Sequence, residues 1–173
     1  LGFGVIEASK GKAQLVDAGV IRTPAKQEDA IRLETIFDEL TTIIEETKPT
    51  EMSVEKLFFA QNVTTAMTVA QARGVVLLCG KQAGLNIFEY TPLQIKQALT
   101  GYGRADKSQI QEMVKVILQL KQIPKPDDAA DALAAAITHS MTIRAWASPK
   151  CEIIKVMIAV LSGVVSEKLE ALV

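Results

Sequence analysis

The chain has 173 residues, of which 49% are hydrophobic, and its formal net charge is −1 at pH 7. This length fits one domain with a sizeable core. No apolar stretch approaches the roughly 20 residues of a membrane span, and the first residues lack the regions of a signal peptide, so we expect a cytoplasmic protein without membrane segments. The near-neutral net charge excludes a strong overall field for attracting nucleic acid.

The first half of the sequence alternates strand-like and helix-like patterns. The turn Ser9-Lys10-Gly11-Lys12 separates two alternating segments and predicts a hairpin, and Lys48-Pro49 ends a helical pattern. We expect, in chain order, strands over 2–8 and 13–21, a helix over 27–46, a strand over 51–57 and a helix over 63–83.

The second half is richer in helices. Thr91-Pro92 is a sound helix start, with Thr at the N-cap and Pro in the first turn. We expect a strand over 86–90, a helix from Thr91-Pro92 to just before Gly101, and helices over 107–120 and 127–146. The resulting order of elements predicts an α/β fold in which a mixed sheet is flanked by helices.

Three acidic residues stand in apolar surroundings. Glu55 ends a short strand, and Asp128 and Asp131 share one face at the start of an Ala-rich helix. Carboxylates at the start of a helix also serve as N-caps and are stabilised by the helix dipole. These structural roles explain Asp127 or Asp128 but not Asp131. The alternative is an oxygen-ligand site for Mg²⁺ and metal-assisted phosphodiester chemistry.

A basic window runs from Lys96 to Lys125, with six Lys or Arg against two acids. It is either a solvated helix face or a surface for phosphate backbones. Phe58 is a core aromatic or a side chain that meets bases. His139 lies eight residues beyond Asp131, about 12 Å along a helix, so we expect a hydrogen-bonded helix residue outside the acidic site.

Several segments resemble, in order and spacing, the RuvC family of Holliday-junction resolvases. The resemblance runs from about residue 1 to 146. It is carried by the segments 53–62, 70–75, 88–92, 101–109 and 127–134, the last of which reads Asp-Asp-Ala-Ala-Asp-Ala-Leu-Ala.

The resemblance implies an RNase H-like fold and a homodimeric endonuclease of recombination and repair, which nicks four-way junction DNA symmetrically. It implies two Mg²⁺ ions about 4 Å apart in each site. It also implies RuvA and RuvB, the branch-migration proteins, as partners. By position it assigns catalysis and metal binding to Glu55, Asp128 and Asp131, and DNA binding to Phe58, Arg73, Lys96 and Lys107.

Two departures from the family pattern stand out. The family's first catalytic Asp lies in a Gly-Ile-Asp-Pro-Gly motif that belongs upstream of Leu1, so we expect a truncated chain that lacks a central strand and leaves two sheet neighbours unpaired. We expect a resolvase domain over 1–146 and a tail over 147–173. In that tail, Met157–Val165 resembles the opening strand of RuvA, or is an unrelated apolar segment.

Three functions therefore remain open from the sequence. The first is a Mg²⁺-dependent junction endonuclease. The second is a junction-binding but catalytically impaired chain, because the first catalytic Asp is absent. The third is an RNase H-like protein that does not act on DNA, such as a kinase, which the lack of a Gly-rich phosphate loop disfavours.

Overall fold

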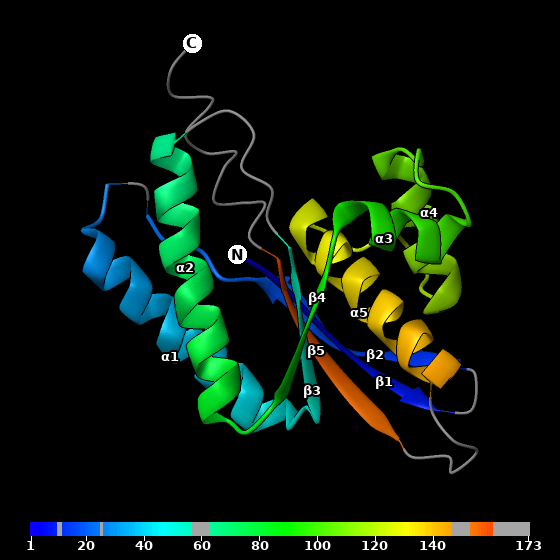
Figure 1. The fold of residues 1–173 in the computed structure, drawn as a ribbon, viewed down its shortest axis with the longest axis horizontal. Helices are drawn as coiled ribbons and strands as arrows, with labels where there is room; N and C mark the ends of the chain where they lie inside the picture. The colour runs from blue at the N-terminus through cyan, green and yellow to red at the C-terminus, as the bar shows by residue number, and fades with distance from the viewer. Residues whose placement is uncertain (10–11, 25, 57–62, 147–152, 161–173) are drawn as a thin grey trace.

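The structure is a computed structural model that describes residues 1–9, 12–24, 26–56, 63–146 and 153–160 (Figure 1). Its elements confirm the predicted alternation of strands and helices and add one strand near the C-terminus. They are, in chain order, β1 (Gly2–Ser9), β2 (Lys12–Val20), α1 (Asp29–Thr47), β3 (Glu51–Glu55), α2 (Val63–Gln82), β4 (Asn86–Tyr90), α3 (Pro92–Thr100), α4 (Lys107–Ile117), α5 (Asp127–Trp146) and β5 (Ile154–Val160).

The strands form one mixed sheet in the order β2-β1-β5-β3-β4. β1 is antiparallel to β2 and to β5, whereas β3 is parallel to β5 and to β4. The predicted hairpin is thus β1 and β2. The mixed sheet with helices packed on it confirms the α/β class expected from the order of elements.

The expectation that two sheet neighbours would be left unpaired is wrong for the described residues. β5 lies between β1 and β3 and pairs with both. Its sequence, Ile-Lys-Val-Met-Ile-Ala-Val, is apolar on both faces, which suits a strand covered on both sides. Part of the segment interpreted as a tail is therefore a central strand of the same sheet.

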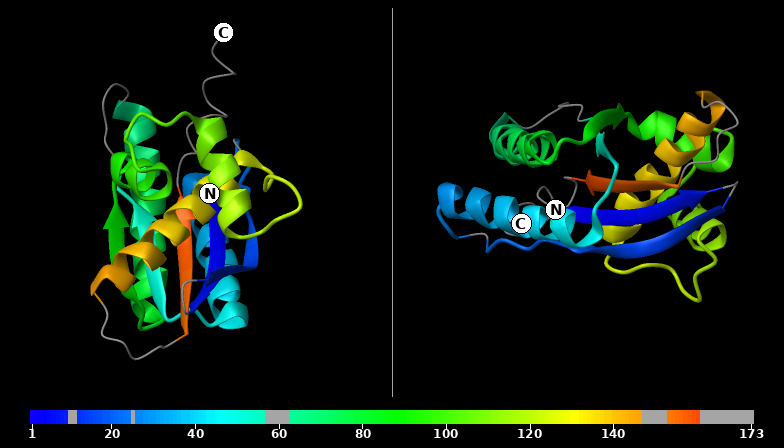
Figure 2. Two further views of the ribbon diagram at one scale, coloured as in Figure 1. Left: turned by 90° about the vertical axis from the view of Figure 1, so that its right-hand side faces the viewer. Right: turned by 90° about the horizontal axis from the view of Figure 1, so that it is seen from below.

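Helices cover both faces of the sheet (Figure 2). α1 and α2 lie on one face, and α5 lies on the other with α3 and α4 packed beside it. β5 shows the alternation that this arrangement requires, because Met157 and Ala159 enter the core under α1 and α2, while Val156 and Ile158 enter the core under α5.

Small residues let α5 lie close to the sheet. A Cβ atom added to Gly4 of β1 would lie 2.9 Å from Cδ2 of Leu133, and one added to Gly2 would overlap the backbone of Asp128. On the helix side the run Ala134–Ala136 is buried. The start of α5 is therefore held directly against β1, which fixes where its first acidic residues stand.

Capping boxes orient the two shorter helices. Thr91 and Asp106 each accept a hydrogen bond from the backbone N–H three residues on, and Gln94 and Gln109 bond back to the caps. The predicted start of α3 at Thr91-Pro92 is confirmed. Cys79 is buried, as expected for a small core residue. None of the described helices combines the length and apolar character needed to cross a bilayer.

Candidate functional site

The alternation of β3 decides which of its side chains face α5. Met52 and Val54 pack into the core under α1 and α2, so Glu51, Ser53 and Glu55 point to the other face. Glu55 ends the strand. Burial raises the pKa of its carboxyl group, and the charge of Asp131 raises it further. Glu55 and Asp131 are therefore near neighbours, a proximity that the sequence made plausible without placing the two side chains.

The first two turns of α5 add further carboxylates to this place. Burial is the main cause that raises the pKa of Asp131, and the charges of Asp128 and Asp127 act in the same direction. We call Glu55, Asp127, Asp128 and Asp131 the acidic cluster. It joins the end of β3 to the start of α5, which lie side by side only because α5 packs across the sheet.

Lys107, the first residue of α4, reaches into the acidic cluster. Its Nζ lies 3.2 Å from Oδ2 of Asp127 and 3.4 Å from Oδ2 of Asp131. Its charge lowers the pKa of Asp131, against the effect of burial, and lowers the pKa of exposed Asp127. The helix α4 therefore contributes a positively charged side chain to the acidic cluster.

Lys96 approaches the same region from α3. Asp106, which caps α4 just before Lys107, has its pKa lowered first by the backbone N–H of Gln109 and then by Ser108, with the charge of Lys96 as a smaller cause. The two predicted phosphate-contacting lysines therefore flank one aspartate. They stand on the neighbouring helices α3 and α4, and Lys107 is the one that contacts the acidic cluster.

The acidic cluster has the oxygen donors that a divalent cation needs, but its described side chains are not arranged around one metal position. Carboxylate oxygens are the ligands that Mg²⁺ prefers. Yet within the described residues no group of three or more His, Cys, Asp and Glu side chains is arranged to hold a metal ion. The structure thus brings Glu55 and Asp131 together and places Asp128 on the adjoining turn, without closing the predicted three-carboxylate cage.

The remaining predicted contacts are placed differently. Phe58 lies outside the described residues. Arg73, on α2, bonds Oε1 of Glu89 on β4 at 2.6 Å, and its side chain is only 17% exposed. Its guanidinium group thus already ties a helix to the sheet. Any contact of Arg73 with DNA stays a prediction.

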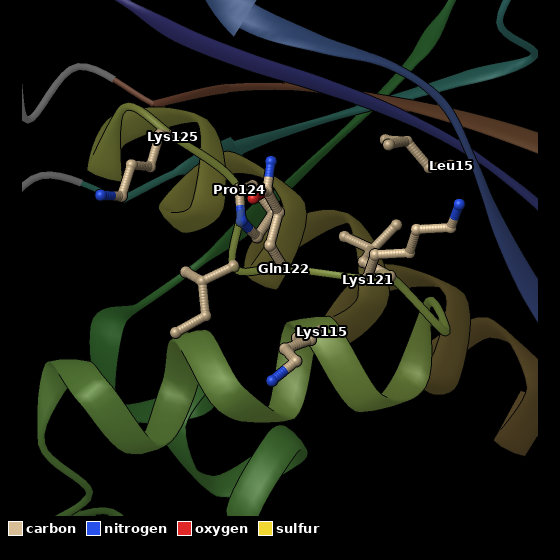
Figure 3. Close-up of a pocket in the computed structure, with 8 residues that line it drawn as sticks. Leu15, Lys115, Lys121, Gln122, Pro124 and Lys125 are labelled. Carbon is tan, nitrogen blue, oxygen red and sulfur yellow. The ribbon is translucent and has the colours of Figure 1, made fainter.

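A basic pocket adjoins the acidic cluster (Figure 3). It has a volume of about 690 Å³ and lies between the end of α4, the segment leading to α5, and β2. Three lysines and a glutamine surround apolar side chains: Leu15, Lys115, Leu120, Lys121, Gln122, Ile123, Pro124 and Lys125. The charge of Lys125 also lowers the pKa of Asp127, which connects the basic pocket to the cluster.

The comparisons with known proteins point to one family. A family model described as "Crossover junction endodeoxyribonuclease RuvC" matches residues 1–139. The chain belongs to the RuvC family. It is 54% identical over 143 residues to RuvC of Heliobacterium modesticaldum, across 82% of this chain and 88% of that protein. It is also 54% identical over 144 residues to RuvC of Halothermothrix orenii, across 83% and 87%.

Solved RuvC structures share the fold. A structure of Thermus thermophilus RuvC in complex with Holliday junction substrate matches with a TM-score of 0.80 and 33% identity, over 88% of this chain and 92% of that one. A second structure of Thermus thermophilus RuvC gives a TM-score of 0.74 at 32% identity, over the same shares. The mixed sheet with its flanking helices is therefore the RNase H-like fold that the sequence predicted. Membership of this nuclease family implies divalent-metal dependence.

Within the segment that matches RuvC, the sequence did not reveal one buried polar network. His139 of α5 contacts the hydroxyl of Tyr90 through Nδ1, at 2.8 Å, and Oε2 of Glu51 through Nε2, at 2.7 Å. The expectation of a hydrogen-bonded helix residue outside the acidic site is confirmed. Its partners were not foreseen, because Glu51 and Tyr90 lie 88 and 49 residues away and share no motif with it.

Proposed function

We propose that this chain recognises four-way junction DNA and hydrolyses phosphodiester bonds with the help of divalent metal ions. The observation that carries the proposal is the proximity of Glu55 and Asp131, two half-buried carboxylates whose pKa values are both raised, at a place that Lys107 also reaches. Two carboxylates held together away from water repel each other, and a cation relieves that repulsion. The family match over residues 1–139 covers this entire place.

Three residues of the acidic cluster, and the lysine that contacts it, then have a role. Glu55, Asp128 and Asp131 would hold the metal, which we propose is Mg²⁺, with two ions in each site. When bound, a divalent cation stabilises negative charge on the phosphate and lowers the pKa of water. Lys107 neutralises the cluster in the absence of metal, and its ammonium group is placed to contact a phosphate oxygen once Asp131 is engaged elsewhere.

The basic side chains around the cluster suit a phosphate backbone. We propose that Lys96 and Lys107 bind close to the scissile phosphate and that the basic pocket binds the backbone further along. Among the described residues, Lys121 and Lys125 have no carboxylate within ion-pair distance, so their charges are available to DNA. Phe58, as a base contact, and Arg73, as a backbone contact, complete the proposed surface.

Symmetric cutting of a four-way junction needs two active sites related by a two-fold axis. We therefore propose that the protein works as a homodimer in recombination and repair, with each copy nicking one strand. RuvA and RuvB are the proposed protein partners.

A second function is favoured by one specific observation. β5 runs beside β3 and carries no Asp or Glu, so this strand supplies no carboxylate to the acidic cluster. The described residues likewise contain no ready metal cage. The alternative is therefore a protein that binds junctions without cutting them.

One pair of assays separates the two functions. Junction binding is measured by gel shift in Ca²⁺, and nicking of the same labelled junction is followed after adding Mg²⁺. The endonuclease proposal expects both, with nicking lost in Asp131→Asn and retained in Glu45→Gln, which changes an exposed glutamate on α1. Binding without nicking supports the alternative, and loss of both would contradict the shared claim of junction recognition.

A further inference from the structure

We propose that Glu51, Tyr90 and His139, here called the His139 network, are positioning residues that set how α5 lies on β3 and thereby hold Asp131 against Glu55. This inference rests on the proposed function, since it assigns the network to the metal site. The three residues do not belong to the acidic cluster themselves. Glu51 and His139 lie on the same two elements as Glu55 and Asp131, and Tyr90 joins them from β4, where it pairs with Glu55.

Both ring nitrogens of His139 have a hydrogen-bond partner within the network. Burial lowers the pKa of His139, which favours the neutral ring. A neutral ring with its proton on Nε2 donates to Oε2 of Glu51 and accepts from the Tyr90 hydroxyl at Nδ1, so both ring nitrogens are satisfied. The Phe88 ring lies against the imidazole, with centroids 4.4 Å apart. The imidazole of His139 is thus held by partners on β3 and β4 at once.

The His139–Glu51 contact and the Asp131–Glu55 pair are separated by about the same distance on α5 and on β3. Glu51 and Glu55 are four residues apart on β3, which is about 13 Å along a strand. His139 and Asp131 are eight residues apart on α5, which is about 12 Å along a helix. Because these spans are nearly equal and the elements run in opposite directions, anchoring His139 to Glu51 brings Asp131 level with Glu55.

The rest of the α5 interface ties the helix mainly to β1, where Leu133 packs against Gly4, and less directly to β3. The buried helix surface between Asp131 and His139 consists of Ala132 and Ala134–Ala136 together with the larger Leu133 and Ile137. Smooth alanine surfaces pack closely but interdigitate little, so a helix shift of part of a turn costs them few contacts. Hydrogen bonds lose most of their strength when misaligned, so the contact of His139 with Glu51 adds a directional tie between α5 and β3.

The first experiment measures geometry without metal or DNA. Glu55→Cys/Asp131→Cys is prepared in the full chain, with Cys79→Ala and Cys151→Ser, and treated with a short thiol-to-thiol crosslinker. We expect rapid crosslinking, slowed several-fold by Glu51→Ala and restored by Glu51→Gln, whose amide oxygen still accepts from Nε2. Tyr90→Phe, which removes one hydroxyl and keeps the ring, provides a milder test should Glu51→Ala fail to fold.

The second experiment measures metal affinity. Mn²⁺ binding to the otherwise unaltered chain is titrated by calorimetry, and we expect Glu51→Ala and Tyr90→Phe to weaken it about tenfold, as removal of partners outside the ligand shell commonly does. Ser140→Ala is the matched control. It removes a buried hydroxyl next to His139 whose one partner among the described residues is the backbone carbonyl of Ile137, so it tests loss of a buried polar group without loss of the network.

The outcomes separate this inference from the proposed function. Crosslinking that is unchanged in Glu51→Ala and Tyr90→Phe, or slowed equally in Ser140→Ala, overturns the positioning role. If the wild-type chain binds no Mn²⁺, the metal-site proposal fails, while the crosslinking still decides whether the network sets the register. Slowed crosslinking together with weakened Mn²⁺ binding in the network variants alone supports both.

Discussion

The ammonium nitrogen of Lys107 lies 3.4 Å from Oδ2 of Asp131, although Lys107 begins α4 and Asp131 lies one turn into α5. This contact balances the acidic cluster. Burial and the neighbouring aspartates favour a protonated Asp131, and Lys107 favours the ionised form that a metal would require. Lys107 therefore favours the ionised carboxylate of Asp131, which is the form that binds a cation.

Removing this lysine is expected to raise the pKa of Asp131 further. In Lys107→Gln the main influence that opposes burial is lost, so Asp131 takes up a proton at higher pH. Carboxyl ¹³C NMR titration of the metal-free protein measures the change. Lys96→Gln is the control, because Lys96 acts on Asp106 and should leave the titration of Asp131 unaltered. An unchanged Asp131 in Lys107→Gln would show that the contact does not persist in solution.

Neutralising Glu55 is expected to stabilise the metal-free fold while abolishing nicking. Its pKa is raised, so the folded state binds a proton more tightly than the unfolded chain and loses stability as pH rises through the raised value. Glu55→Gln removes that cost, and we expect a gain of about 0.5–1 kcal/mol at pH 7. Urea unfolding measures it, with Glu45→Gln as the exposed control; a loss of stability would contradict the assignment.

The sequence predicted the acidic residues better than it predicted what surrounds them. Asp128 and Asp131 share a helix face by spacing alone, and Glu55 ends a predicted strand in apolar surroundings, so these three positions were accessible before the structure. The contact of Lys107 with Asp131 was not, because it depends on how α4 packs beside α5. The His139 network was equally hidden, since its members lie on three elements whose neighbours are set by the sheet.

The strand pairing in the sheet was also only partly predictable from the sequence. Alternation and turn residues predicted the hairpin of β1 and β2, since those signals are local. The place of β5 between β1 and β3 depends on pairing over more than 100 residues. Its apolar sequence indicates a covered strand but not which neighbours cover it, and so the sequence suggested a separate tail.

The central place of β5 predicts a large cost for shortening its buried side chains. Ile158 is fully buried under α5, so Ile158→Ala is expected to lower the free energy of unfolding by about 2–5 kcal/mol. Ile153 lies just before the strand and is 59% exposed, so Ile153→Ala should change it by less than about 0.5 kcal/mol. Equal, small effects in urea unfolding would show that β5 does not occupy the centre of the sheet.

Stability is expected to fall in mild acid because of His139. Burial lowers its pKa in the folded state, so the unfolded chain binds a proton more readily. Its contribution is complete above the ordinary pKa of about 6.5 and declines as pH falls through the lowered value, with a limiting slope of about 1.4 kcal/mol per pH unit. His139→Gln should flatten this slope.

The effect of His139 must be separated from that of the buried carboxylates. Glu55 and Asp131 have raised pKa values, so their protonation favours the folded state and acts in the opposite direction as pH falls. Unfolding free energies of wild type and His139→Gln are therefore compared over the same range, about pH 7 to 5.5, because both proteins contain the same carboxylates. If wild type and His139→Gln decline in parallel there, His139 is not the titrating group.

Junction binding is expected to lose salt dependence when the basic pocket is neutralised. Each lysine that contacts a phosphate releases counterions on binding, so the slope of log affinity against log salt falls by about 0.9 for each contact removed. Lys121→Gln/Lys125→Gln should therefore reduce the slope by nearly 2.

The matched control is Lys81→Gln, an exposed lysine of α2 on the opposite face of the sheet. Fluorescence anisotropy at several salt concentrations, in Ca²⁺, measures binding without cutting. A slope that falls equally in Lys81→Gln would mean that the lysines act only through overall charge, and an unchanged slope in the double variant would place the DNA elsewhere.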